Sequence, residues 1–269
     1  KQKVRWGLVM IADMHVHSTF SPDGISTMEE QCIAALEKGE RIICFTDHVD
    51  YNVAEKNNGI IKDNSKANFI IEEYLIEIDR LRKKYPELKI LKGIEFSEPH
   101  LFKKEFERYS QYPFDYILGS VHHCYEGVFP GAANISEDEA IKEYYDIMIR
   151  SLEECFFDGM AHLDFPRSFF DHWNISETII NRILELMVEK SISLEINTSS
   201  LIDNNDMPMP DFKIIEKYSA IGGTRIVLGS DAHQTERIFN KFETVLEKLP
   251  SGMVIGYYEN RIFYPLYNV

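Results

Sequence analysis

Short apolar runs recur seven times along this chain, with longer amphipathic segments between them. This alternation is typical of an α/β protein with a largely parallel sheet. The predicted strands cover residues 9–16, 42–46, 90–96, 116–121, 159–163, 193–197 and 225–230. Seven strand-helix units within 269 residues favour a closed barrel over an open sheet.

The intervening segments carry helix signals. Thr27 and Ser136 are each followed three residues later by a glutamate, Glu30 and Glu139, which is the capping-box pattern of a helix start. Apolar spacing or composition predicts further helices over residues 66–85, 176–190, 211–219 and 234–248.

Six of the seven predicted strands end in side chains that bind metals well. These are His15 and His17, His48, Glu95, His122 and His123, His162, and Asp231 and His233. The active sites of barrels are built at the carboxyl ends of several strands. We therefore expect these side chains to converge on one metal centre.

The ligand types indicate the chemistry. His15 and His17 are two residues apart, so on a strand both rings point the same way and can reach one ion. Imidazole and carboxylate ligands without thiolate suit zinc, iron or manganese. A carboxylate such as Glu95 can bridge two ions, an arrangement that activates a bridging hydroxide for in-line attack at phosphorus.

Composition narrows the class of protein. The formal net charge of -15 disfavours binding to nucleic acid. The four cysteines form no CxxC pair, which favours reduced thiols in a cytoplasmic protein. No apolar run approaches the roughly 18 residues that a membrane helix needs. We expect one domain over residues 1–269, with 1–10 a candidate N-terminal extension.

Several motifs resemble the polymerase-and-histidinol-phosphatase (PHP) superfamily, and most closely its stand-alone histidinol-phosphatase branch. The resemblance covers residues 11–264 and rests on Asp13-Met-His-Val-His17, Ser21-Pro-Asp-Gly24, Phe45-Thr-Asp-His48, Gly93-Ile-Glu95, the segment 114–122, Ala161-His-Leu-Asp164, the segment 194–199 and Gly229-Ser-Asp-Ala-His233. It implies a distorted (β/α)7 barrel that holds three divalent transition metal ions.

The resemblance also implies which residues bind each ion. The first ion would take His15, His17, Glu95 and Asp231; the second Glu95, His122 and His162; the third Asp23, His48 and His233. Asp23 stands where some relatives have histidine, and it also suits the turn Ser-Pro-Asp-Gly. Glu95, Asp231 and His233 are the candidate catalytic residues, with Asp231, His233 or a metal-bound water as the acid.

Other residues are candidates for contact with the substrate. Arg167 follows His162 by five residues, and a guanidinium matches two phosphate oxygens, although a salt bridge is an equal alternative. Asn197 ends the sixth predicted strand, where no metal ligand is expected. His123 is interpreted as structural or substrate-facing. The long loops 49–65 and 124–135 could form a lid or an ordinary surface.

The implied activity is hydrolysis of a small phosphomonoester, foremost L-histidinol phosphate in histidine biosynthesis. A nucleotide, sugar phosphate or phosphotyrosine substrate is the first alternative. An amidohydrolase-type barrel with a carboxylated lysine fits less well, because Lys92 has no chelating neighbour. A non-catalytic scaffold module is the remaining alternative, and the complete ligand set argues against it.

Overall fold

The computed structural model describes residues 10–52, 68–171, 175–201 and 207–269. The candidate extension therefore lies outside the described residues apart from Met10, and so does most of the predicted loop 49–65.

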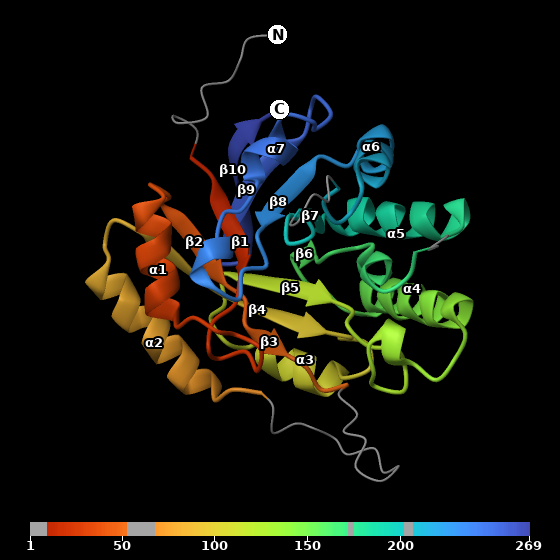
Figure 1. Ribbon diagram of the computed structural model, residues 1–269, viewed down its shortest axis with the longest axis horizontal. Helices are drawn as coiled ribbons and strands as arrows, with labels where there is room; N and C mark the ends of the chain where they lie inside the picture. The colour runs from red at the N-terminus through yellow and green to blue at the C-terminus, as the bar shows by residue number, and fades with distance from the viewer. Residues whose placement is uncertain (1–9, 53–67, 172–174, 202–206) are drawn as a thin grey trace.

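Within the described residues, one curved sheet runs in the order β1-β2-β4-β5-β6-β7-β8-β9-β10, with β3 paired to β4 (Figure 1). Neighbours are parallel except for the antiparallel pair β9 and β10. The strands are β1 Ala12–Val16, β2 Ile42–Phe45, β3 His48–Val49, β4 Lys89–Ser97, β5 Tyr116–Ser120, β6 Gly159–Met160, β7 Ser193–Asn197, β8 Arg225–Gly229, β9 Val254–Glu259 and β10 Ile262–Asn268. All seven strands expected from the sequence are confirmed.

Helices lie around the outside of this sheet (Figure 1). They are α1 Met28–Glu37, α2 Ile71–Lys84, α3 Lys103–Tyr109, α4 Glu137–Glu154, α5 Glu177–Lys190, α6 Phe212–Ala220 and α7 Phe242–Leu246. The capping boxes of Thr27 with Glu30 and Ser136 with Glu139 are confirmed at the starts of α1 and α4.

The sheet closes on itself only at the carboxyl ends of its strands. There the backbone of His17 donates to the carbonyl of Ala232 at 3.0 Å, and that of Asp231 donates to the carbonyl of His15 at 2.8 Å. At the opposite end β8 pairs instead with β9, which displaces it from β1. The result is the distorted, TIM-like (β/α)7 barrel that the resemblance to the PHP superfamily implied.

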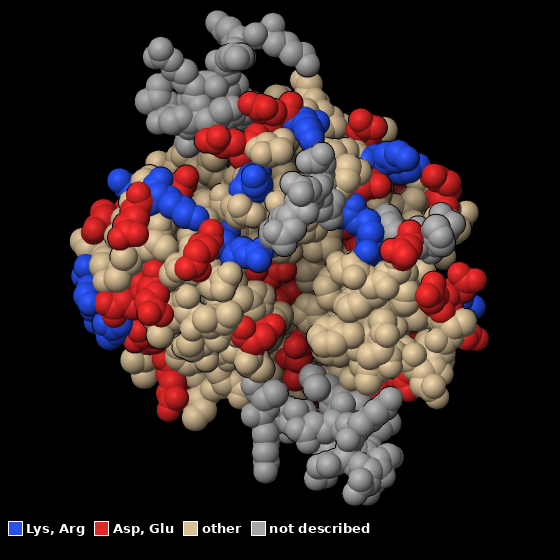
Figure 2. Space-filling view, in the orientation of Figure 1, with Lys and Arg blue, Asp and Glu red and all other residues tan. Residues whose placement is uncertain are grey.

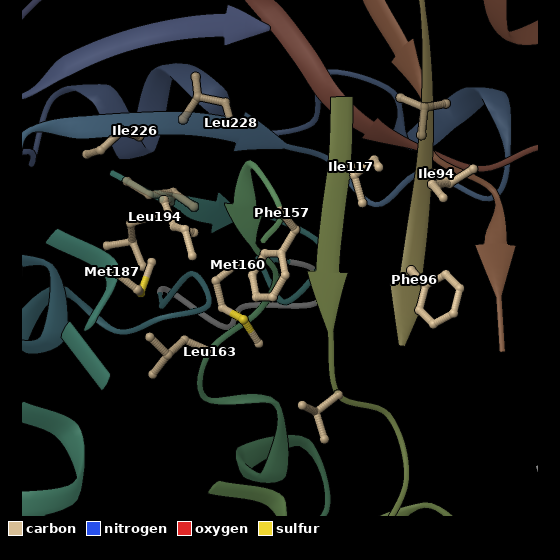
Figure 3. Close-up of a cluster of buried hydrophobic side chains, with 14 of the residues drawn as sticks. Ile94, Phe96, Ile117, Phe157, Met160, Leu163, Met187, Leu194, Ile226 and Leu228 are labelled. Carbon is tan, nitrogen blue, oxygen red and sulfur yellow. The ribbon is translucent and has the colours of Figure 1, made fainter. Parts of the chain in front are cut away.

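Apolar side chains fill both sides of the sheet. Between sheet and helices lies a large cluster that includes Ile94, Ile117, Leu194 and Leu228 (Figure 3). Inside the barrel lies a smaller cluster: Ala12, Met14, Ile42, Cys44, Leu91, Tyr116, Leu118, Ala161, Val227 and Tyr258. Strand positions two apart share a face, so the inner cluster lies on the same face of the strands as the predicted ligands. We call this cluster the floor of the barrel.

A β-bulge in β1 aims its histidines inward. Asp13 pairs with Ile43 but Val16 pairs with Phe45, so β1 has one residue more than β2 over this stretch. Met14 packs in the inner cluster, whereas Val16 packs in the outer one. Strict alternation from Met14 would turn His15 outward, and the extra residue restores its inward direction.

The helix predicted over residues 234–248 is wrong for most of its length. The structure has a 3-10 turn at Thr235–Arg237 and helix α7 only from Phe242 to Leu246. Phe239 and Lys241 have φ angles of 55° and 59°, a left-handed conformation that interrupts an α-helix. The backbone N–H of Phe239 donates to Asp13 at 2.9 Å, so a contact with β1 determines this break.

The hairpin of β9 and β10 was not predicted from the sequence. Its turn residues Asn260 and Arg261 both have positive φ angles, 52° and 64°, which suits the right-handed twist of a two-residue hairpin. The turn is held under the barrel, where Asp115 accepts the Asn260 N–H at 3.1 Å and Asp158 pairs with the Arg261 guanidinium. No helix in the described part of the chain is both long and apolar enough to cross a membrane.

Replacing Arg261 by methionine tests this clamp. Burial raises the pKa of Asp158 from 3.8 to about 6, and Arg261 opposes that rise. A carboxyl group with a raised folded-state pKa destabilises the fold progressively as the pH rises from its unfolded pKa through its folded pKa. We expect Arg261→Met to lower the free energy of unfolding by about 1–3 kcal/mol at pH 8 and by less at pH 5.

Urea unfolding at the two pH values measures this loss. Arg150→Met is the matched control, because Arg150 is an exposed arginine that pairs with Glu154 on the surface of α4. The control is expected to change the stability little. An equal loss for Arg261→Met at both pH values would contradict a role through Asp158.

Candidate metal centre

The nine predicted metal ligands converge at the carboxyl ends of the barrel strands. The first group joins β1 to the segment after β8: His15 and His17 bring their Nε2 atoms to 2.8 Å, and Asp231 Oδ1 lies 3.2 Å from His17 Nε2. Glu95 Oε2 lies 3.3 Å from His15 Nε2. The four side chains predicted for the first ion therefore surround one point.

The second group lies on the other oxygen of the same carboxylate. Glu95 Oε1 is 3.1 Å from His122 Nε2 and 3.0 Å from His162 Nε2, and these two nitrogens are 3.3 Å apart. Glu95 is fully buried. Its two oxygens therefore face different ligand groups, as a bridging carboxylate requires.

The third group lies nearer the solvent. Asp23 Oδ2 lies 3.2 Å from His233 Nε2 and 3.6 Å from His48 Nε2. His48 Nδ1 lies 2.9 Å from Glu95 Oε2, and potential ligand atoms of His48, Glu95 and His122 all lie within 4.8 Å of one another. The third group therefore adjoins the other two at Glu95.

Hydrogen bonds to the Nδ1 atoms of His15 and His17 show that the first group suits a cation. The carboxylate of Glu195 can only accept, so His15 Nδ1, 2.5 Å away, is the donor. Ser21 donates its own proton to Asp47 at 2.7 Å, so it accepts from His17 Nδ1 at 3.0 Å. When both rings are neutral, their Nε2 lone pairs face each other, and a positive charge between them removes this repulsion.

The electrostatics of the unliganded residues agree with this interpretation. Burial opposes the charge on His15, but Glu195, Asp231 and Glu95 together raise its pKa well above its usual value. Burial and the neighbouring His233 and His48 lower the pKa of His17 well below its usual value. A proton on His15 can thus lie between the Nε2 atoms of His15 and His17. A bound metal ion would displace this proton.

Orphaned buried atoms give a second test of fit. Glu95 Oε2, His48 Nδ1 and His233 Nε2 are buried and make no hydrogen bond of acceptable geometry. Burial opposes ionisation of Glu95, yet the surrounding His122, His15 and His48 hold its pKa well below its usual range. The donor set is thus an ionised carboxylate among imidazoles, which fits transition metal ions.

The ligand groups open into a cavity of about 440 Å³. Besides ligands, it is lined by Pro22, Asp50, Asn68, His123, Phe129 and Phe165. Figure 2 shows acidic atoms in a hollow near the centre of one face of the molecule. A cavity with one apolar wall and one metal-binding wall can hold a small molecule that carries an anionic group.

The two predicted substrate contacts have partners within the protein. Arg167 donates to the carbonyl of Pro208 at 2.7 Å and lies 3.6 Å from Asp164 Oδ2. Asn197 is buried and donates to Asp231 Oδ2 at 3.2 Å. Neither is among the described residues that line the cavity. Their contact with substrate stays a prediction.

Other residues of the site were not predicted individually, although Asp50 and Phe129 belong to the loops 49–65 and 124–135 that were expected to form a lid or an ordinary surface. Asp50 Oδ1 lies 3.2 Å from His122 Nδ1, behind a ligand ring. Phe129 and Phe165 form the aromatic wall, and Phe129 packs against His123 with ring centroids 4.8 Å apart. Glu195 was also missed, although the polar alternation of Ser193, Glu195 and Asn197 was a visible signal of a strand with one polar face.

Fold and site together define a barrel whose strand ends carry clusters of residues able to bind metal ions. The PHP domain model matches residues 13–199, more than half of the chain. The chain belongs to the PHP domain family.

The chain is similar over most of its length to proteins that are named histidinol-phosphatases. The chain is 31% identical to a probable histidinol-phosphatase of Thermotoga maritima, over 88% of this chain and 90% of the relative. It is 27% identical to the histidinol-phosphatase of Lactococcus lactis subsp. lactis, over 88% and 90%.

A solved structure shares the fold. It is a crystal structure of histidinol phosphate phosphatase from Lactococcus lactis subsp. lactis complexed with zinc, L-histidinol and phosphate. It aligns with a TM-score of 0.78 at 22% identity and covers 94% of this chain and 98% of that chain.

Metal binding is expected to stabilise the folded protein. An ion that binds only the folded state raises the free energy of unfolding by about 2.7 kcal/mol when its concentration is 100 times its dissociation constant. Chelated protein should therefore melt at a clearly higher temperature when manganese or zinc is restored. Glu95→Ala should lose most of this rise, because Glu95 contacts all three ligand groups.

Differential scanning calorimetry with and without metal measures the effect. Glu259→Ala is a suitable control, because Glu259 pairs with Lys89 at the opposite end of the barrel. A full metal-induced rise in Glu95→Ala would show that this carboxylate is not central to metal binding.

Proposed function

We propose that this protein hydrolyses L-histidinol phosphate to L-histidinol and phosphate, as a step of histidine biosynthesis in the cytoplasm. The observation that carries the proposal is the set of three ligand groups that adjoin one another at Glu95 and border one cavity. The substrate is supported by the histidinol-phosphatases that align with 88% of this chain. The four cysteines are free and buried, which suits a reducing compartment.

We propose three divalent ions, zinc, iron or manganese, held by the three ligand groups. Bound ions would activate water at neutral pH and neutralise charge on the phosphoryl oxygens. Glu95 would hold two ions at a fixed separation through its two oxygens. His15, His17, His122 and His162 are at most 5% exposed, so these rings also keep bulk water from the centre.

Two ligands that solvent can reach are suited to handle the proton of the leaving group. The side chains of His233 and Asp231 are 26% and 18% exposed, and His233 Nδ1 lies 3.0 Å from the carbonyl of Asp231. Both line the cavity, unlike the fully buried His15 and His17. We therefore keep Asp231 and His233 as the proposed catalytic residues beside Glu95.

The apolar wall supports a small substrate with a flat, weakly polar body. Phe129 and Phe165 line the cavity, where Phe165 packs against the ring of His162 with centroids 4.9 Å apart, and Asp50 and Asn68 supply polar groups. A ring such as imidazole can pack on an aromatic face. The proposed partner is thus a small phosphorylated molecule and not a nucleic acid, which the net charge of -15 would repel.

A panel of phosphomonoesters tests the proposal. We expect the highest kcat/KM for L-histidinol phosphate, and lower values for nucleotides, sugar phosphates and phosphotyrosine peptides. Chelation should abolish phosphate release, and manganese, iron or zinc should restore it. If another ester is preferred, the substrate assignment is wrong while the reaction class stands; if no ester is hydrolysed with metal present, both are wrong.

We also propose that Arg167 contacts the substrate phosphate, which requires its guanidinium to leave the carbonyl of Pro208. A charge-assisted hydrogen bond contributes about 1.5–3 kcal/mol, or roughly a 10- to 150-fold change in kcat/KM. Arg167→Ala should show this loss with unchanged metal content. Unchanged kinetics with lowered stability would assign Arg167 to its contacts with Pro208 and Asp164.

A further inference from the structure

β7 contributes none of the nine candidate ligands, yet the face it turns into the barrel is polar. Ser193, Glu195 and Asn197 alternate with Leu194 and Ile196, which pack in the outer apolar cluster. Glu195 is 1% exposed. A carboxylate this deeply buried is costly unless its charge is compensated nearby, so its neighbours indicate its role.

One oxygen of Glu195 lies behind the first ligand group. Its Oε1 accepts from His15 Nδ1 at 2.5 Å, on the side of the ring away from the potential metal-binding atom Nε2. A carboxylate in this place keeps the proton on Nδ1, leaves Nε2 free as a ligand, and makes the ring more basic.

The other oxygen holds the second ligand group. Glu195 Oε2 accepts the backbone N–H of His162 at 2.8 Å. His162 has a φ angle of 22°, a strained backbone for a residue other than glycine, and its Nε2 lies 3.0 Å from Glu95. The hydrogen bond that Glu195 accepts thus stabilises the backbone conformation that directs the His162 ring toward Glu95.

Asn197 extends the same network to a third ligand. Its side-chain amide donates to Asp231 Oδ2 at 3.2 Å and to Glu195 Oε2 at 3.4 Å. Asp231 also has a positive φ angle, 53°. Two neighbouring inward positions of β7 therefore contact ligands from three other segments of the barrel.

The adjacent strand leaves space for this carboxylate. A Cβ atom at Gly229 on β8 would collide with Glu195 Oε1 and lie 2.6 Å from His15 Cβ. Gly229 does not have a positive φ angle, so glycine is required there for space rather than for backbone conformation.

We propose that Glu195 is a positioning residue that couples the first two ligand groups, fixing the His15 tautomer with one oxygen and the His162 backbone with the other. The inference rests on the proposed function only in assuming that these groups bind metal. It predicts that a change at Glu195 weakens metal binding although Glu195 is not itself a ligand. The third group, Asp23, His48 and His233, should be affected least.

The test compares wild type, Glu195→Gln and Gly229→Ala, each stripped of metal and titrated with manganese in chelator buffers without substrate. Glu195→Gln keeps the size of the side chain but removes its charge and half of its acceptors. Loss of such a hydrogen-bond partner typically costs 10- to 100-fold in metal affinity. We expect this weakening in Glu195→Gln, a similar one in Gly229→Ala, and fewer than the wild-type number of ions by elemental analysis.

Asp158→Asn is the matched control, because Asp158 is a buried carboxylate that accepts a backbone N–H at the far end of the barrel. It should lose stability but keep the wild-type affinity for manganese. Nitrogen-15 NMR of the histidines adds a readout that a general loss of packing would not produce. In the metal-free protein, Glu195→Gln should lower the fraction of His15 rings that carry a proton at Nδ1, the atom that faces Glu195.

The outcomes separate the inference from the proposed function. Unchanged affinity and tautomer in Glu195→Gln, with metal bound by the wild type, overturns the inference alone. A wild type that binds no manganese, zinc or iron overturns both. If Glu195→Gln does not fold, Gly229→Ala is measured in its place. Its Cβ crowds the Glu195 carboxylate and His15 Cβ without removing any polar group, so wild-type affinity in that variant rejects the inference.

Discussion

The rest of the structure depends on one buried carboxylate, that of Glu95, at the centre of a ring of histidines. Its oxygens lie within 3.5 Å of ring nitrogens from five histidines on four segments: His15, His17, His48, His122 and His162. An ionised carboxylate without water is stable only among positive charges. The barrel supplies the geometry for that compensation, because parallel strands bring their carboxyl ends to one place.

Much of the remaining structure serves to direct these ligands. The bulge in β1 turns His15 and His17 inward, and Asp47 acts on His17 through the hydroxyl of Ser21. β7 lacks a predicted ligand but places Glu195 and Asn197 behind ligands of other strands. Hydrogen-bonded support of this kind sets the tautomer and direction of a ring, which the ligand types alone do not.

The two ends of the barrel are stabilised by different interactions. At the carboxyl ends, closure of β1 against the segment after β8 brings polar side chains together around space for ions. At the other end the inner apolar cluster fills the barrel, and the β9–β10 hairpin is held by Asp115 and Asp158. Because the apolar floor is separate from the polar carboxyl ends of the strands, the buried charges of the site do not disturb the packing of the core.

The sequence by itself determined the seven strands and the ligand-bearing ends of six, because apolar runs and the residues that follow them are local features. It also predicted both capping boxes. It did not predict the break in the helix expected at 234–248, since that break depends on a hydrogen bond from Phe239 to Asp13, far away in the chain. Only the tertiary structure revealed the bulge in β1, the partners of Arg167 and the place of Glu195. Those features depend on which residues of distant strands become neighbours, and that is decided by how the barrel closes and not by any local pattern.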